Sequence, residues 1–378
     1  MTPFHPPSQD HPPARDLVVL RRFRTDDADD VTAGCADPLT QRFLSLLPSP
    51  YTREDALWWI NEGAPAAFAA GGTAYAMADP DTDRVLGGCG YHPARSGAYE
   101  MGYWVAPWGR GRGVATSAAR ALAAEAFAAG AARVFLHTDQ ANAASQRVAI
   151  AAGFTREGVA RGAGQRRTGE RYDHIVWGRL ATDPDGPSPC RLPDLPGPDG
   201  RPSRAGVLTD GVVRLRRLES ADATHLHRLH ALPEVVATSV PPVPRDRPTI
   251  ERRCAHAEAA WLAGDRADFT ILDAATGEFA GDIGLFYTEP ATQQAMVGYS
   301  LMPEWRGRGY ATRSVRLVAD WALRHVGVVR VIAGTAPDNV ASQRVLLRAG
   351  FVREGYQRAR LPGPDGTRVD DIVYALVP

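Results

Sequence analysis

Residues 104–116 read WVAPWGRGRGVAT, and residues 300–312 read SLMPEWRGRGYAT. Six of the seven residues from Arg110 to Thr116 are identical to those from Arg306 to Thr312, at an offset of 196 positions. Solenoid repeats have periods of about 20 to 50 residues, so a repeat at this much longer distance indicates two copies of a whole domain.

Three further blocks repeat in the same order. NAASQRVAIAAGFTREG (142–158) recurs as NVASQRVLLRAGFVREG (339–355), with twelve identical residues of seventeen. GERYDHIVW (169–177) recurs as GTRVDDIVY (366–374), and LRRFRTDDA (20–28) recurs as LRRLESADA (215–223). Four collinear blocks make chance resemblance implausible. They predict an N-terminal domain over residues 17–181 and a C-terminal domain over residues 210–378.

The segments outside these domains are rich in proline. Residues 1–16 are polar and have no apolar central region, so we expect a disordered tail rather than a signal peptide. Residues 182–209 are dense in Pro, Gly, Asp and Ser, which is typical of an extended, semi-rigid linker.

Composition narrows the classes of partner. The formal net charge is zero, so nothing global attracts the chain to nucleic acid or to an anionic membrane. The four cysteines have no metal-ligand spacing, and we expect free thiols and no metal. No apolar run approaches membrane-spanning length. These features favour a cytoplasmic protein.

Each half shows the pattern of an α+β domain. In the first half we expect Trp58 and Trp59 to pack within a helix. The elements expected there, in chain order, are a strand at 18–23, a helix from 25, a helix over 54–70, strands at 73–78, 85–91 and 99–105, a helix from 113–115, a strand at 133–138, a helix over 144–152 and two closing strands. This pattern predicts a mixed, mostly antiparallel sheet with helices on both faces.

The repeated glycine and arginine loop has the chemistry of an anion site. It lies between an expected strand and an expected helix, where glycine lets the backbone approach a ligand closely. The first amides of a helix have no internal acceptor and suit a pyrophosphate, and flanking arginines can add charge-assisted contacts.

The sequence argues against several other classes of loop. A GxGxxG dinucleotide fingerprint would need glycine where Val114 or Thr116 stands, and a Walker A loop would need lysine, which the chain lacks. An RG-rich nucleic-acid segment would be longer and would not open a well-patterned helix. A tight turn that binds no ligand remains the simplest alternative for one copy taken alone.

The order of the motifs resembles the GNAT acyltransferase superfamily. In each half, Arg-x-x-Gly-x-Ala follows a GYW or GYS strand and precedes Asn-x-x-Ser and Ala-Gly-Phe. The pattern is most similar to the RimJ/RimL-like branch, and it covers nearly all of both halves. It implies an acetyl-CoA donor and direct transfer to an amine within a ternary complex. A protein N-terminus, an amino-sugar antibiotic and a small metabolite remain open as acceptors.

The resemblance also assigns residues. It implies that Glu100 removes the proton of the amine and that Ser145 protonates the departing thiolate. The tyrosine that many members carry four residues after the serine is replaced by Ala149 and Leu346. The residues expected to hold CoA are Val105, Arg110, Gly111, Arg112, Gly113, Val114, Ala115 and Asn142, and in the second copy Arg306, Gly307, Arg308, Gly309, Tyr310, Ala311, Asn339 and Ser342.

The two copies differ at the expected base. Met296 stands at the position of Glu100, so we expect the chemistry in the N-terminal domain unless another group, such as Asp282 or Glu289, replaces it. The C-terminal domain would then serve as an intramolecular packing partner. The alternative for the whole chain is a CoA-binding sensor or scaffold with little catalysis of its own.

Overall fold

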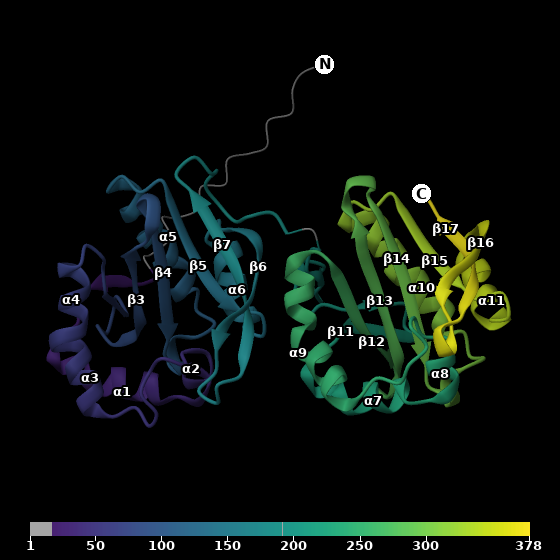
Figure 1. The fold of residues 1–378 in the computed structure, drawn as a ribbon, viewed down its shortest axis with the longest axis horizontal. Helices are drawn as coiled ribbons and strands as arrows, with labels where there is room; N and C mark the ends of the chain where they lie inside the picture. The colour runs from purple at the N-terminus through teal and green to yellow at the C-terminus, as the bar shows by residue number, and fades with distance from the viewer. Residues whose placement is uncertain (1–16, 191) are drawn as a thin grey trace, which may run out of the picture. The chain divides into compact units, whose positions relative to one another are not determined.

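The computed structural model describes residues 17–190 and 192–378, which divide into two compact units between Pro189 and Cys190. The tail expected over residues 1–16 lies outside the described residues. Each unit is an open sheet with helices packed on it (Figure 1). Within the described ranges, no helix combines the length and the apolar character that crossing a membrane requires.

The N-terminal unit has a seven-stranded sheet in the order β1-β2-β3-β4-β5-β7-β6. Only β4 and β5 are parallel, which confirms the mixed, mostly antiparallel sheet. Its elements are β1 (Val19–Arg21), α1 (Ala28–Ala36), α2 (Pro38–Phe43), α3 (Arg53–Trp58), α4 (Ala64–Ala69), β2 (Tyr75–Ala78), β3 (Val85–Pro93), β4 (Ala98–Val105), α5 (Val114–Ala128), β5 (Arg133–Asp139), α6 (Ala143–Ala151), β6 (Thr155–Gln165) and β7 (Arg171–Leu180).

The C-terminal unit repeats this plan in an eight-stranded sheet of order β10-β11-β12-β13-β14-β15-β17-β16, in which β14 and β15 are the parallel pair. Its elements are β10 (Leu208–Thr209), β11 (Val213–Arg217), α7 (Ala223–His230), α8 (Pro233–Ala237), α9 (Arg247–Ala263), β12 (Arg266–Asp273), β13 (Phe279–Glu289), β14 (Gln294–Leu301), α10 (Tyr310–Trp321), β15 (Arg330–Thr335), α11 (Val340–Ala349), β16 (Val352–Pro362) and β17 (Arg368–Leu376).

Helices cover both faces of the N-terminal sheet, as expected. Successive side chains of a strand point to opposite faces. On β4, Met101, Tyr103 and Val105 pack with the apolar side of α5, whereas Trp104 packs with Val31 and other residues of the first helices. We call these two sides the α5 face and the α1 face. The corresponding sides of the C-terminal sheet are the α10 face and the α7 face.

The helix expected over residues 54–70 is interrupted. A π-helical turn, Trp59–Gly63, separates α3 from α4. Pro65 explains the break, because it lacks the amide that the helical ladder requires. The expectation that Trp58 packs is wrong, since 63% of it is exposed, whereas Trp59 is half-buried and makes an edge contact with Phe23. The short helix α2 was not predicted, although Asp37 caps it by accepting from the Thr40 amide and Pro38 is its first residue.

Part of the segment expected as a linker belongs to the C-terminal unit. Leu192 and Leu195 are fully buried in the core of that unit, and the indole Nε1 of Trp261 donates to the carbonyl of Leu192 at 2.9 Å. Strand β10 then pairs with β11 at the edge of the sheet. Apolar residues spaced among prolines therefore anchor this segment to the domain that follows it.

We predict that Leu195→Ala destabilises the C-terminal unit by ~2–5 kcal/mol, the usual cost of truncating a buried leucine. Hydrogen–deuterium exchange on the whole chain should show lost protection in β11–β17 and none in β1–β7. The matched control is Leu46→Ala, because Leu46 is 99% exposed. Unchanged exchange in Leu195→Ala would show that this segment does not stabilise the C-terminal core.

Candidate active site

The two parallel strands at the centre of each sheet separate after a short ladder. β4 and β5 pair only from Ala98–Arg133 to Glu100–Phe135, although both strands continue for several residues. β14 and β15 likewise pair only as far as Met296–Ile332. Beyond that point the facing backbone amides and carbonyls have no partner strand within the described part of the chain. Buried backbone groups need partners, so each opening is suited to an extended ligand that can supply them.

The glycine and arginine loop begins where each opening ends. Gly111 and Gly113 have φ values of +72° and +78°, and Gly307 and Gly309 have values of +74° and +83°. Helix α5 begins directly after Gly113, and α10 begins directly after Gly309. Among the described residues, the amides of 111–116 and of 307–312 have no hydrogen-bond acceptor. Each domain therefore presents six consecutive free amides at a helix N-terminus, which is the chemistry of a pyrophosphate site.

Both arginines of the N-terminal loop already have carboxylate partners. Arg110 pairs with Asp37 and donates to the Thr40 hydroxyl at 3.0 Å, which connects α2 to the loop. Although burial alone would raise it, the pKa of Asp37 is lowered by the hydrogen bond from Arg110. Arg112 donates to Asp79 at 2.7 Å and lowers the pKa of that carboxyl to about 2. These arginines hold the loop in place.

The C-terminal loop leaves one arginine free. Arg306 donates to the Leu301 carbonyl and to Glu234, as Arg110 donates to Val105 and Asp37. Asp273, which occupies the place of Asp79, instead accepts from the Tyr310 hydroxyl. Within the described chain, the Arg308 guanidinium therefore has no ion pair, and it lies 5.3 Å from the Trp305 ring.

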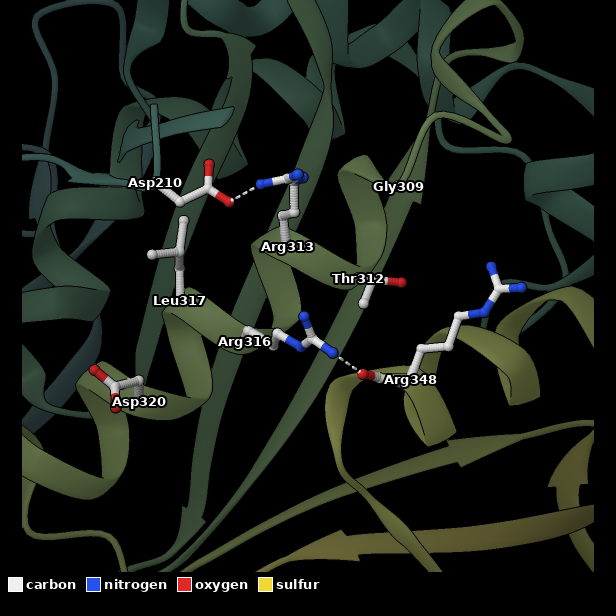
Figure 2. A pocket seen from close by; sticks show the side chains of 8 residues that line it. All are labelled: Asp210, Gly309, Thr312, Arg313, Arg316, Leu317, Asp320 and Arg348. Atoms are coloured by element: carbon white, nitrogen blue, oxygen red, sulfur yellow. Dashed lines mark hydrogen bonds and ion pairs between the residues drawn. The ribbon is translucent and has the colours of Figure 1, made fainter. Parts of the chain in front are cut away.

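A cationic groove continues from this loop between α10 and α11 (Figure 2). It encloses about 600 Å³, and its positive side chains are Arg313, Arg316 and Arg348. Arg313 pairs with Asp210 at 2.6 Å, and Arg316 donates to the carbonyl of Arg348. Arg120 makes the same carbonyl contact in the N-terminal domain, but Ser117 and Ala151 stand at the positions of Arg313 and Arg348.

A serine and a tyrosine hydroxyl meet beside each opening. Asn142 caps α6 by accepting from the Ser145 amide at 3.1 Å, which leaves the serine hydroxyl available. That hydroxyl lies 2.8 Å from the hydroxyl of Tyr103, on β4. Asn339, Ser342 and Tyr299 repeat the arrangement, with 2.9 Å between the two hydroxyls. Burial raises the pKa of both phenols, that of Tyr299 to about 12, so each tyrosine stays protonated at neutral pH.

The expected base of the N-terminal domain belongs to a histidine cluster on the α1 face. His137 Nδ1 donates to Glu100 Oε1 at 2.9 Å, and His92 Nε2 lies 3.4 Å from Glu100 Oε2. The hydrogen bond from His137 lowers the pKa of Glu100. His174 stacks on His137 with ring centres 5.5 Å apart, and burial lowers the pKa of its imidazole. The carboxylate thus remains charged and holds one tautomer of His137.

The same face of the C-terminal domain holds a cavity of about 1410 Å³ that reaches Met296, Tyr299 and Ser342. Asp282, a proposed substitute base, is buried there against Arg253 at 2.9 Å and His230 at 3.2 Å. Although burial alone would raise it, the pKa of Asp282 is lowered strongly by Arg253. The Asp282 carboxyl therefore stays ionised, as the partner of Arg253. Glu289, the other substitute, is exposed in the cavity lining and accepts from Thr292.

The N-terminal domain fills the corresponding space with an aromatic ring. The strand registers place Gly88 and Trp104 where the C-terminal domain has Asp282 and Ser300. A Cβ added to Gly88 would lie 2.6 Å from the Trp104 ring, and one added to Gly34 would lie 2.4 Å from it. Both glycines therefore make room for Trp104. One domain has an aromatic wall where the other has a charged one.

The predicted residues occupy one region in each domain, but sequence reasoning missed several neighbours. Tyr103 and Tyr299 recur at the same offset as the loops, and this signal was available in the sequence. His137 and His174 have no counterpart in the second copy, where Gly334 and Asp371 stand. The repeat therefore gave no signal for them.

Comparisons with known proteins support the resemblance to the GNAT acyltransferases. The family profile described as "Acetyltransferase (GNAT) domain" matches residues 18–155 and 213–352, well over half of the chain. The chain is 40% identical over 91 residues to "Probable N-acetyltransferase YjcK" of Bacillus subtilis, an alignment that covers 24% of this chain and 50% of that protein. It is 26% identical over 173 residues to "Uncharacterized N-acetyltransferase p20" of Bacillus licheniformis, covering 44% and 92%. This chain spans about half the length of the first curated relatives that it matches.

The solved structures that resemble this chain include Mycobacterium smegmatis RimJ in complex with CoA-disulfide. It is 26% identical, with a TM-score of 0.40, and the match covers 46% of this chain and 86% of RimJ. The RimL ribosomal L7/L12 α-N-protein acetyltransferase in complex with CoA is 21% identical, with a TM-score of 0.41 and coverages of 45% and 97%.

The profile, the motif order and the two repeated folds agree. The chain belongs to the GNAT acetyltransferase family and carries two of its domains.

Proposed function

We propose that the chain transfers acetyl groups from acetyl-CoA to amines directly, in a ternary complex, and that the N-terminal domain does so through Glu100. The observation that supports this proposal is that a carboxylate–histidine pair and a pair of hydroxyl groups lie on opposite sides of one opening. Glu100 and His137 lie on the α1 face, whereas Tyr103 and Ser145 lie on the α5 side. A thioester in the opening would have both within reach.

The donor would be held mainly by backbone amides. The six free amides before and within the first turn of α5 suit its pyrophosphate, because the loop arginines are occupied by Asp37 and Asp79. The unpaired backbone of β4 and β5 suits the amide-containing arm that leads to the thioester. The C-terminal domain has the same free amides and the same short parallel ladder, so these features support CoA binding in both domains.

The proton transfers then follow from the two clusters. The Glu100–His137 pair takes a proton from the ammonium group, and the neutral amine attacks the thioester carbonyl. As the C–S bond breaks, the thiolate takes a proton from the Ser145 hydroxyl, which the Tyr103 hydroxyl contacts. The second proton that the amide nitrogen releases then restores the serine hydroxyl. The alternative, a CoA-binding scaffold, does not require the half-buried hydroxyl pair or the charged Glu100.

We expect Glu100→Gln to lower the N-terminal turnover at least ~100-fold, the lower end of what a positioned general base contributes. The measurement is acetyl-CoA-dependent thiol release in a Gly309→Val background, in which a β-branched residue at positive φ disrupts the C-terminal loop. Glu157→Gln, which removes a charge from a surface ion pair with Arg133, is the control and should change little. Near-normal turnover in Glu100→Gln would refute the assignment of the base.

The C-terminal cleft favours an acidic acceptor. Arg245, Arg253 and Arg266 line it together with the buried Asp282, and the buried Asp268 lies behind Arg253 and Arg266 as their ion-pair partner. Arg253 and Arg266 pair with these aspartates, whereas Arg245 has no ion pair among the residues that the structure describes. Burial and the two neighbouring arginines lower the pKa of Arg245. An amine that also carries a carboxylate would supply the missing negative charge.

We predict that Arg245→Met raises the Kd of alanyl-aspartate for the CoA-loaded chain ~10-fold, since a charge-assisted hydrogen bond contributes ~1.5–3 kcal/mol. Calorimetry with alaninamide, which lacks a carboxylate, should show no change. Arg247→Met is the matched control, because Arg247 is exposed and paired with Glu251. Equal weakening of both ligands would argue against anion recognition at this position.

A further inference from the structure

Three positions of the histidine cluster differ in the C-terminal domain. Met296, Gly334 and Asp371 stand where the N-terminal domain has Glu100, His137 and His174. The strand registers place all three on the α7 face. Met296 pairs with Ile332, Gly334 lies two residues further along β15, and Asp371 on β17 precedes Ile372, which pairs with Thr335.

The missing histidine makes room for a carboxylate. A Cβ added to Gly334 would lie 2.6 Å from Asp371 Oδ2 and 2.8 Å from its Oδ1. The Asp371 carboxyl therefore occupies the space directly above Gly334, where the side chain of His137 begins in the N-terminal domain. A side chain at position 334 would have to displace it.

Asp371 has the properties of a proton acceptor rather than of a structural ion. It is 4% exposed, it lines the large cavity together with Met296 and Ser342, and its Oδ1 has no hydrogen-bond partner among the described residues. In the same cavity Asp282 Oδ1 also lacks such a partner, but Asp282 Oδ2 is held by Arg253 and His230, whereas Asp371 has no ion pair within the described chain. An unpartnered buried carboxylate oxygen is costly and calls for a ligand or a function.

We propose that Asp371 is the general base of a second catalytic centre in the C-terminal domain, with Ser342 and Tyr299 as its hydroxyl pair. This inference rests on the proposed function of the chain. Asp371 takes one proton from the ammonium of the acceptor, and the neutral amine attacks the thioester carbonyl. The N–C bond forms, the C–S bond breaks, and the thiolate takes a proton from the Ser342 hydroxyl. The amide nitrogen releases its second proton, which restores the Ser342 hydroxyl, and Asp371 gives its proton to the solvent, so one proton leaves in each turnover.

The surroundings favour this role. Burial raises the pKa of Asp371, against the opposing influence of Arg360 on β16 and of the backbone amides of Thr335 and Ile372. β14 and β15 present Met296 and Gly334, which do not ionise. A raised pKa makes the carboxylate a stronger base. Its activity should therefore be lost as the pH falls through that raised pKa.

The test uses the full chain in a Glu100→Gln background with alanyl-aspartate as acceptor. We expect residual acetyl-CoA-dependent turnover, which Gly309→Val abolishes and Asp371→Asn lowers at least ~100-fold. The matched control is Asp370→Asn. Asp370 is the neighbouring carboxylate, and both of its oxygens accept hydrogen bonds, from Tyr356 and from the Ala359 amide. This control should keep most of the activity.

Hydroxylamine separates a base from a structural residue, because it is largely unprotonated at neutral pH and needs no base. Asp371→Asn should retain turnover with hydroxylamine and lose the acidic limb of its pH profile with alanyl-aspartate. Equal loss with both nucleophiles would assign Asp371 a structural role and overturn the proposal. If the wild-type chain is active but Glu100→Gln has no residual turnover, the proposal for Asp371 is also overturned. That result would leave the assignment of Glu100 in the N-terminal domain intact. A wild-type chain inactive toward both nucleophiles would contradict the proposed function itself.

Discussion

The separation of two parallel strands at the centre of each sheet is the constraint on which the site depends. A parallel pair that remained hydrogen-bonded along its length would leave no room for a ligand and no free backbone groups. Because β4 and β5 pair only as far as Glu100 and Phe135, the sheet opens next to the side chains of Glu100 and His137. The same opening brings together groups from the two faces of the sheet, which a closed sheet would keep apart.

The loop and the hydroxyl pair are nearly the same in both domains, whereas the opposite face differs at almost every functional position. Gly111, Gly113 and their counterparts share their positive φ values, and the serine–tyrosine distance differs by only 0.1 Å. On the other face, Trp104 fills the space where the C-terminal domain has a cavity with buried charges. We therefore propose that the two domains share one donor chemistry and differ in their acceptor environments. A chain whose second domain served only to bind CoA would not need an open, charged cavity beside its thioester site.

Much of this could be predicted from sequence because the repeat supplied an internal comparison. Strand and helix order, the mixed sheet and the anion loop follow from patterns that occur twice. The roles of the loop arginines could not be predicted, because Arg110 and Arg112 find their partners, Asp37 and Asp79, on distant segments. Met296 was correctly identified as unable to accept a proton. The role proposed for Asp371 could not be predicted, because its carboxyl reaches the site only through the space above Gly334, which only the folded sheet reveals.

Calorimetric titration with CoA tests most directly whether one chain holds two independent donor sites of the same design. We expect two sites per wild-type chain and one site in each of Gly113→Val and Gly309→Val, since valine at a positive φ would displace the amides proposed to bind the pyrophosphate. The site that remains in Gly113→Val should weaken more steeply with salt, because Arg308 and the groove arginines surround it. A single site in the wild-type chain, or loss of both sites in either variant, would contradict the account.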